Sequence, residues 1–212
     1  MIDFYSTQGH SKEDYEKSHG ARFDFFVKRF GFDKVQGKSI LDVGCGLGFM
    51  FDRINTYGNR CFGIDYTNQN NIEDLITFIQ ADLNLPFSEK TNEKFDIIIC
   101  AETLEHLQNP YNCLYEIKQL MKEDSFLYLS IPSEATTHNT LYPGLFYPVE
   151  NFEEFLRQMA FEIITHEQHN AAFSQEVFVL KSLSWDNNNQ RMKFYKSDDN
   201  QRCVPPHVAI NL

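Results

Sequence analysis

The sequence predicts an α/β protein with a Rossmann-like, doubly wound sheet of seven strands, mostly parallel, with an antiparallel terminal hairpin strand and helices at the N-terminus. Three observations predict this class. Short apolar runs alternate with segments of helical spacing. A glycine-rich turn follows the first apolar run. The 212 residues, 42% of them hydrophobic, suit one sizeable core.

Helical spacing comes first, from Ser11 to Phe30, in one or two helices. The predicted apolar face contains Tyr15, Ala21, Phe25, Phe26 and Phe30.

Strands and helices then alternate with short connections, which predicts parallel strands with helices on both faces of the sheet. The run F-D-I-I-I-C at Phe95 is the most strand-prone, and Pro110 suits a first helical position. The predicted strands are Ser39–Val43, Cys61–Ile64, Thr77–Gln80, Phe95–Cys100 and Phe126–Ile131, with an antiparallel pair at Glu162–His166 and Glu176–Leu180. The predicted helices are Leu47–Tyr57, a short one near Gln69–Leu75, Pro110 to about Met121, and Val149–Met159.

We expect a single domain over residues 1–183, in which 1–36 form a helical segment on the substrate side and 133–148 a candidate lid. Residues 184–212 are polar, rich in Asn and contain Pro205 and Pro206, so we expect a weakly ordered tail or a flexible cover.

Composition limits the partners. Acidic residues outnumber basic ones 30 to 19, giving a net charge of −11, which argues against nucleic acid and favours a small-molecule substrate. No apolar run is long enough to span a bilayer, and the first ten residues do not resemble a secretory signal, so we expect a cytoplasmic protein. The five cysteines form no C-x-x-C pair, which favours reduced core thiols. The sequence leaves the oligomeric state open.

The segment Ile40–Met50 reads I-L-D-V-G-C-G-L-G-F-M and contains the most informative motif. Glycines at 44, 46 and 48 leave backbone N–H groups accessible beside a helix start, which suits a nucleoside-bearing cofactor. The spacing differs from the G-x-G-x-x-G of dinucleotide-binding folds because Phe49 stands where that pattern requires glycine. Asp42, just before the turn, favours a ligand that carries a cation.

This motif resembles the first motif of class I S-adenosylmethionine-dependent methyltransferases, whose acidic-G-x-G-x-G loop embraces the aminoacyl end of the cofactor. The next strand ends continue the match. Asp65 in F-G-I-D-Y follows the turn by about twenty residues and suits the ribose hydroxyls. Asp82 suits the adenine amine and Leu83 an apolar contact, although Asp82 is equally explained as a turn or helix-cap residue.

After the fourth strand, C-A-E-T-L-E-H-L-Q-N-P resembles the motif of the branch that includes the ubiquinone-biosynthesis-type and small-molecule O-methyltransferases. The resemblance covers roughly residues 40–180. It implies in-line methyl transfer from S-adenosyl-L-methionine to a small molecule, a glycan or a lipid intermediate, with a hydroxyl as the expected acceptor. The expected cofactor-binding residues are Asp42, Gly44, Cys45, Gly46, Gly48, Asp65, Tyr66, Asp82, Leu83 and Glu102.

A hydroxyl acceptor benefits from a base, and His106 is the first candidate because an unperturbed imidazole titrates near neutral pH. His106 is equally explained as a residue that organises the loop, and His138 is the second candidate. Glu102, Glu105 and His106 have a spacing that suits a divalent cation, but we expect no metal, since loop-capping carboxylates explain the same residues.

Aromatic residues of the long connection suggest where the acceptor binds. Tyr142, Phe146 and Tyr147 are candidates to close over it, although loop aromatics pack on a core at least as often. An opposite wall is expected from the N-terminal residues Tyr5, Tyr15, His19 and Arg22.

Two rival functions remain. One is an NAD(P)-dependent oxidoreductase, which the glycine spacing and the Asp82 motif disfavour. The other is a catalytically silent protein that keeps the fold for cofactor binding or interaction. No N-P-P-Y-like tetrapeptide follows the fourth strand, which argues against nitrogen methylation of nucleic acid.

Overall fold

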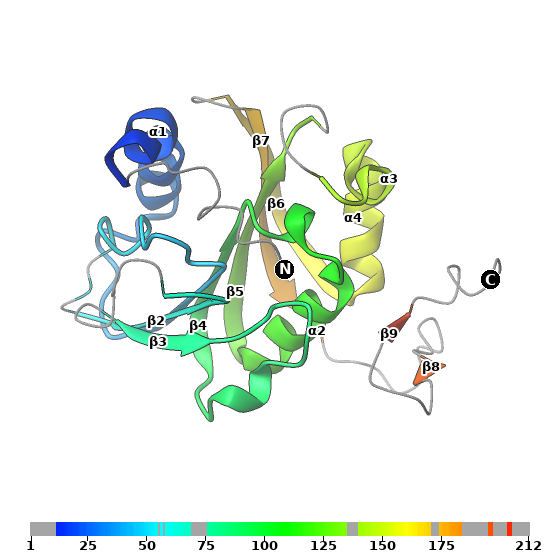
Figure 1. Cartoon of the computed structure of the whole chain (residues 1–212), viewed down its shortest axis with the longest axis horizontal. Helices are drawn as coiled ribbons and strands as arrows, with labels where there is room; N and C mark the ends of the chain where they lie inside the picture. The colour runs from blue at the N-terminus through cyan, green and yellow to red at the C-terminus, as the bar shows by residue number, and fades with distance from the viewer. Residues whose placement is uncertain are drawn as a thin grey trace.

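The computed structural model describes residues 12–54, 56, 58–68, 76–134, 140–170, 174–183, 195–196 and 203–204. Within these ranges, seven strands form one sheet in the order β3-β2-β1-β4-β5-β7-β6 (Figure 1). The short strands β8 and β9 pair with each other in a separate sheet. The strands are β1 Ser39–Val43, β2 Arg60–Asp65, β3 Thr77–Gln80, β4 Phe95–Ala101, β5 Met121–Pro132, β6 Phe161–Asn170, β7 Ser174–Ser182, β8 Tyr195–Lys196 and β9 Cys203–Val204. The helices are α1 Lys12–Phe30, α2 Pro110–Leu120, α3 Pro143–Phe146 and α4 Val149–Gln158, with short 3₁₀ helices η2 Ser88–Lys90 and η3 Leu104–His106.

Strands β3, β2, β1, β4 and β5 pair in parallel, whereas β7 is antiparallel to both β5 and β6. The predicted fold class is therefore confirmed. The strand order reverses between β1 and β4, so the connections leave these two neighbours in opposite directions along the sheet. Open α/β sheets bind ligands beyond the carboxyl ends of such a pair.

Two clusters of buried apolar side chains lie between the sheet and its helices. In Figure 1, α1 lies on one side of the sheet, and α2 and α4 lie on the other. Helix α1 packs on one face, where Phe26 and Val27 meet Ile40 of β1. Helices α2 and α4 pack on the other face, where Leu114 and Leu156 are fully buried. Each such side chain contributes roughly 1.5–3 kcal/mol by leaving water.

Helix α1 is continuous over the predicted range, but its buried face differs from the prediction. Ala21 is exposed, and the buried positions among the described side chains are Gly20, Arg22, Phe26 and Val27. The prediction of Ala21 was wrong because helical spacing favoured an apolar residue over an arginine that is buried with an ion-pair partner.

The segment after the glycine turn is a series of turns over 49–54 rather than the predicted helix Leu47–Tyr57. Hydrogen bonds typical of an α-helix occur only from Asp52 to Gly48 and from Ile54 to Met50, and the other backbone bonds there are one residue shorter. Closely spaced glycines with positive φ disfavour helix nucleation at this place. The predicted helix near residues 69–75 lies outside the described residues.

The other elements follow the prediction closely. Helix α2 begins at Pro110, and the side chain of Asn109 caps it by accepting a hydrogen bond from the Asn112 N–H. Strand β5 begins at Met121, earlier than predicted, because Met121 pairs with Phe95 before a register shift.

Four cysteines, Cys45, Cys61, Cys100 and Cys113, are buried free thiols, as predicted. Among the described helices, none is long and apolar enough to cross a membrane.

Candidate active site

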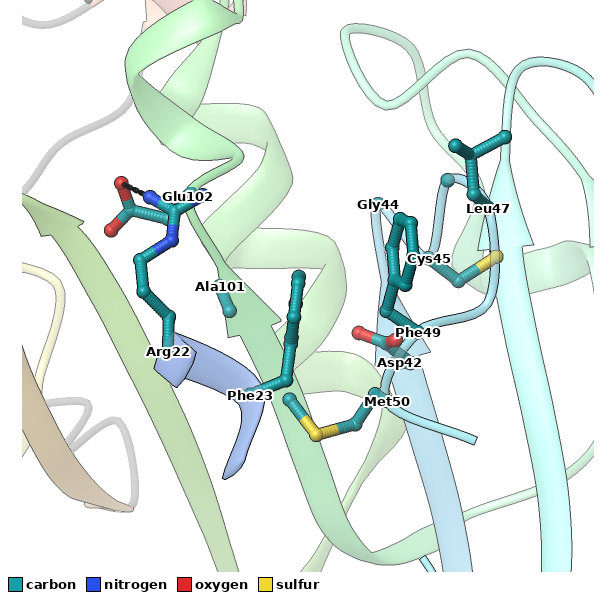
Figure 2. Close-up of a pocket in the computed structure, with 11 residues that line it drawn as sticks. Arg22, Phe23, Asp42, Gly44, Cys45, Leu47, Phe49, Met50, Ala101 and Glu102 are labelled. Atoms are coloured by element: carbon teal, nitrogen blue, oxygen red, sulfur yellow. Dashed lines mark hydrogen bonds and ion pairs between the residues drawn. The ribbon is translucent and has the colours of Figure 1, made fainter. Parts of the chain in front are cut away.

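A small cavity of about 40 Å³, open to solvent, lies at the carboxyl ends of β1 and β4 (Figure 2). Five predicted cofactor residues line it: Asp42, Gly44, Cys45, Gly46 and Glu102. Helix α1 supplies Arg22 and Phe23 from the opposite side. Residues of the glycine turn and of helix α1 therefore line the same cavity.

Gly44 is required at its position for two reasons. Its φ of +77° is a left-handed conformation that favours glycine. A Cβ added there would also lie 2.4 Å from Oγ1 of Thr103. The Thr103 hydroxyl donates a hydrogen bond of 3.0 Å to the carbonyl of Ala101, which fixes the orientation of the Thr103 side chain.

Asp42 lies at the floor of the cavity and is 5% exposed. Burial, followed by the nearby charge of Asp65, raises its pKa from 3.8 to about 7. A cation beside a buried carboxyl group lowers the pKa of that group, because the cation stabilises the ionised form.

Asp65 ends β2 and is held against the glycine turn. One oxygen accepts from the Gly46 N–H at 2.8 Å and the other from the Tyr66 N–H at 2.6 Å. These two hydrogen bonds fix the carboxylate beside the glycine turn, and a carboxylate is the kind of acceptor that ribose hydroxyls need.

Glu102 lies just beyond β4 and has a φ of +51°, unusual for a residue with a side chain. Its carboxylate accepts a hydrogen bond from Arg22 at 2.9 Å (Figure 2). It also accepts one from the Ser130 hydroxyl at 2.9 Å. Burial raises the pKa of Glu102, and Arg22 and Ser130 oppose that rise. Arg22 and Ser130 both hydrogen-bond to the Glu102 carboxylate, so the positions of the three side chains depend on one another.

Two further contacts fix α1 beside the turn. The rings of Phe23 and Phe49 stack with centroids 5.3 Å apart. Nε of Arg53 donates to Asp24 at 2.8 Å. The helix thus closes one side of the cavity.

Several predicted cofactor residues do not line this cavity. Asp82 accepts two hydrogen bonds from Asn84, at 2.9 Å each, in the turn after β3. Leu83 is buried in the core, Tyr66 is 42% exposed, and Gly48 lies within the turn. Asp82, Leu83 and Tyr66 follow β2 and β3, along the same sheet edge as the cavity.

The predicted catalytic residue His106 belongs to η3, just after β4. Its Nε2 lies 3.7 Å from a carboxylate oxygen of Glu105, and its side chain is 27% exposed. The Glu105 side chain is fully buried, and burial together with Glu102 raises its pKa far above the usual range. His138 lies outside the described residues.

The three candidate acceptor residues differ in environment. The Tyr142 hydroxyl donates to the Gln108 carbonyl and its side chain is half exposed. Phe146 is fully buried and packs against Phe152. The Tyr147 hydroxyl donates to the Pro132 carbonyl at the end of β5. Of the expected N-terminal wall, Arg22 reaches the cavity, Tyr5 lies outside the described residues, and the side chains of Tyr15 and His19 are not described.

Two residues of the site, Phe23 and Ser130, were not predicted from the sequence. Ser130 had a recognisable signal, because it is a polar residue in the apolar strand β5 and pairs in register with Ala101 at the end of β4. Phe23 had none, since any of the phenylalanines of α1 satisfies the helical pattern.

A family model described as a methyltransferase domain matches residues 15–203, which is most of the chain. The chain belongs to the methyltransferase-domain family. The family predicted from the glycine turn is thereby confirmed, and with it the methyltransferase class.

Curated relatives of this methyltransferase include the ubiquinone biosynthesis O-methyltransferases of two bacteria. The protein of Glaesserella parasuis is 30% identical over 141 residues, covering 57% of this chain and 60% of its own length. That of Haemophilus ducreyi is 36% identical over 106 residues, covering 44% of this chain and 45% of its own. The chain thus spans about half the length of these relatives.

Solved structures share the fold of this methyltransferase. An S-adenosylmethionine-dependent methyltransferase from Clostridium acetobutylicum superposes with a TM-score of 0.61 at 13% identity, covering 79% of this chain and 96% of its own. Magnesium protoporphyrin IX methyltransferase from Synechocystis, solved with bound S-adenosylhomocysteine, has a TM-score of 0.60 at 19% identity and covers 86% and 89%. The fold is that of the class I methyltransferases.

Proposed function

We propose that this protein transfers a methyl group from S-adenosylmethionine to a hydroxyl of a small-molecule, glycan or lipid-intermediate acceptor. The family match supports methyl transfer, and structural neighbours solved with S-adenosylmethionine or S-adenosylhomocysteine support the cofactor. The two O-methyltransferase relatives support oxygen as the acceptor atom.

The arrangement of charges in the cavity carries the cofactor proposal. The aminoacyl end of S-adenosylmethionine has a carboxylate, an ammonium and a sulfonium, so it needs both a cation and anions around it. Arg22, which is ion-paired with Glu102, provides the cation, and Asp42 provides an anion. A pyrophosphate, in contrast, is repelled by the carboxylates of Asp42 and Asp65 beside the glycine turn. The same charges disfavour the alternative of a nicotinamide-dependent oxidoreductase.

The chemical step asks little of the protein, because the sulfonium is already a good methyl donor. As the methyl carbon forms its bond to the acceptor oxygen, its bond to sulfur breaks and the hydroxyl proton leaves. Positioning of acceptor and donor in line supplies most of the rate.

His106 is our candidate for accepting that proton, because it follows β4 at the same sheet edge and its side chain is partly exposed. We expect His106→Ala to lower kcat by about 10²- to 10⁴-fold, the usual contribution of general base catalysis. A fall in kcat of less than tenfold, with the pH profile of kcat unchanged, would assign His106 a structural role in the loop.

The alternative of a divalent cation at Glu102, Glu105 and His106 finds no support in these side chains. Arg22 and Ser130 engage the Glu102 carboxylate, and Glu105 is buried with a strongly raised pKa. In the described part of the chain, no three His, Cys, Asp or Glu side chains gather as a metal site. We therefore assign no step to a metal.

The test is incubation of the protein with S-adenosylmethionine labelled with ¹³C in the methyl group and an extract of small metabolites. Carbon NMR of the products separates methyl groups on oxygen, nitrogen and carbon. A labelled O-methyl product is expected. Label on nitrogen or carbon alone would refute the acceptor atom, and no transfer despite cofactor binding would favour a catalytically silent protein.

A further inference from the structure

A second cavity lies at the opposite edge of the sheet from the candidate active site. It measures about 450 Å³, is open to solvent, and is formed where β1, β2 and β4 begin and where β5 follows α2. Its charged lining residues are Lys38, Arg60, Asp96 and Lys122. None of them contributes to the cavity that holds Asp42 and Glu102.

Three basic side chains face one acidic side chain here, although the chain as a whole carries a net charge of −11. Arg60 is also paired with Glu93 outside the cavity lining. The excess of positive charge in a hollow with protein walls attracts small anions, because the walls focus the field.

Asp96 organises the two lysines. One of its oxygens lies 2.7 Å from Nζ of Lys122, and the other lies 3.9 Å from Nζ of Lys38. The first oxygen also accepts from the N–H and the hydroxyl of Ser39, at 2.8 Å each. Burial alone would raise the pKa of Asp96, but the hydrogen bonds from Lys122 and Ser39 lower it to about 2, so the carboxylate stays charged.

A single carboxylate cannot satisfy two ammonium groups. Each ammonium has three donors, and the contact with Asp96 occupies one of them at most. The hydrogen bond to Asp96 nevertheless restricts the Lys122 side chain, which reduces the entropy that a ligand would have to remove on binding. Compact, strongly charged ammonium groups suit phosphate oxygens.

We propose that the cavity lined by Lys38, Arg60 and Lys122 binds the phosphate group of a small phosphorylated molecule. The site is separate from the candidate methyl-transfer site, because the two cavities share no lining residue.

The test is isothermal titration with sodium pyrophosphate at low ionic strength. We expect saturable one-to-one binding to the wild type that weakens as salt is added, since salt screens these exposed charges. The double variant Lys38→Ala/Lys122→Ala is expected to bind at least about tenfold more weakly, because it loses two charge-assisted contacts.

The matched control is Lys28→Ala/Lys90→Ala, which changes the net charge equally at two exposed lysines outside the cavity. It is expected to bind pyrophosphate as the wild type does, and thermal unfolding checks that both variants fold. The proposal is overturned if the wild type shows no binding, if the cavity variant binds as tightly as the wild type, or if the control loses as much affinity.

Discussion

Asp42 combines a burial that costs stability near neutral pH with a proposed role in cofactor binding. Its folded pKa of about 7 lies above its unfolded value of 3.8, so its contribution to stability is complete below pH 3.8 and is lost as the pH rises to 7. We expect Asp42→Asn to remove this pH dependence and to raise the unfolding free energy at pH 7.5, by up to about 4 kcal/mol. Urea unfolding at pH 5 and at pH 7.5 measures the effect.

The same variant should bind S-adenosylhomocysteine at least about tenfold more weakly, because the ammonium of the ligand loses a carboxylate. The exposed Asp33→Asn serves as the control, for which neither change is expected. An Asp42→Asn protein that is no more stable than the wild type at pH 7.5 would contradict the raised pKa.

Gly44 allows a second residue-scale test, because steric overlap can be separated from backbone strain. Gly44→Ala places a Cβ 2.4 Å from Thr103 Oγ1 at a φ of +77°, whereas Gly37 has a φ of +70° and no atom within 4 Å of an added Cβ. We expect Gly37→Ala to cost about 1–2 kcal/mol for strain alone. Gly44→Ala should cost about 1–3 kcal/mol more for the overlap.

Removing the overlapping side chain should recover part of that extra cost. The double variant Gly44→Ala/Thr103→Ala is therefore expected to be more stable than the sum of the two single changes predicts, as denaturant titration would show. Strict additivity would mean that Thr103 does not limit the turn.

At the scale of elements, the end of α4 depends on a buried lysine of α2. Nζ of Lys118 donates to the carbonyls of Met159 and Ala160, where α4 gives way to β6. We expect Lys118→Met to lower the unfolding free energy by about 1–3 kcal/mol at pH 7, because two carbonyls lose a donor. The variant Lys181→Met, at a partly exposed lysine, removes a longer contact to Asp124 and should cost less than about 1 kcal/mol.

The buried position of Lys118 also makes the unfolding free energy depend on pH in the alkaline range. Burial lowers its pKa from 10.5 to about 8, so the folded protein loses the proton before the unfolded chain does. The unfolding free energy of the wild type relative to Lys118→Met should therefore rise between pH 8 and pH 10.5. If the difference in unfolding free energy between the wild type and Lys118→Met stays constant over this range, the lowered pKa of Lys118 is contradicted.

The elements also show what a single sequence could predict. Apolar runs located every strand of the main sheet, because burial on both faces leaves a strong local signal in β1 and β4. The turns after Gly48 were mistaken for a helix, since local spacing does not reveal how three neighbouring glycines weaken the helix. The boundary of β5 depends on pairing with Phe95, which lies far away in the sequence.

At the scale of the molecule, the sequence predicted the strand ends that form the cavity but not the partners that cross it. Asp42 and Glu102 were predicted from motifs within a single segment. Arg22 was expected only as part of a wall, because its ion pair with Glu102 spans 80 residues. Such long-range contacts depend on the folding of α1 against the sheet, which no local pattern records.

At the scale of the whole molecule, the two ends of the central strands carry different sets of charged residues. The carboxyl edge gathers Asp42, Asp65, Arg22 and Glu102 around the glycine turn, and the amino edge gathers lysines around Asp96. The central claim is that the carboxyl-edge cavity binds S-adenosylmethionine.

Isothermal titration with S-adenosylhomocysteine and, separately, NAD tests this claim most directly. We predict one-to-one binding of S-adenosylhomocysteine, no binding of NAD, and at least about a tenfold loss of affinity for S-adenosylhomocysteine in Asp65→Ala, which lacks the carboxylate beside the Gly46 N–H. Binding of NAD without S-adenosylhomocysteine, or an unchanged affinity for S-adenosylhomocysteine in Asp65→Ala, would contradict it.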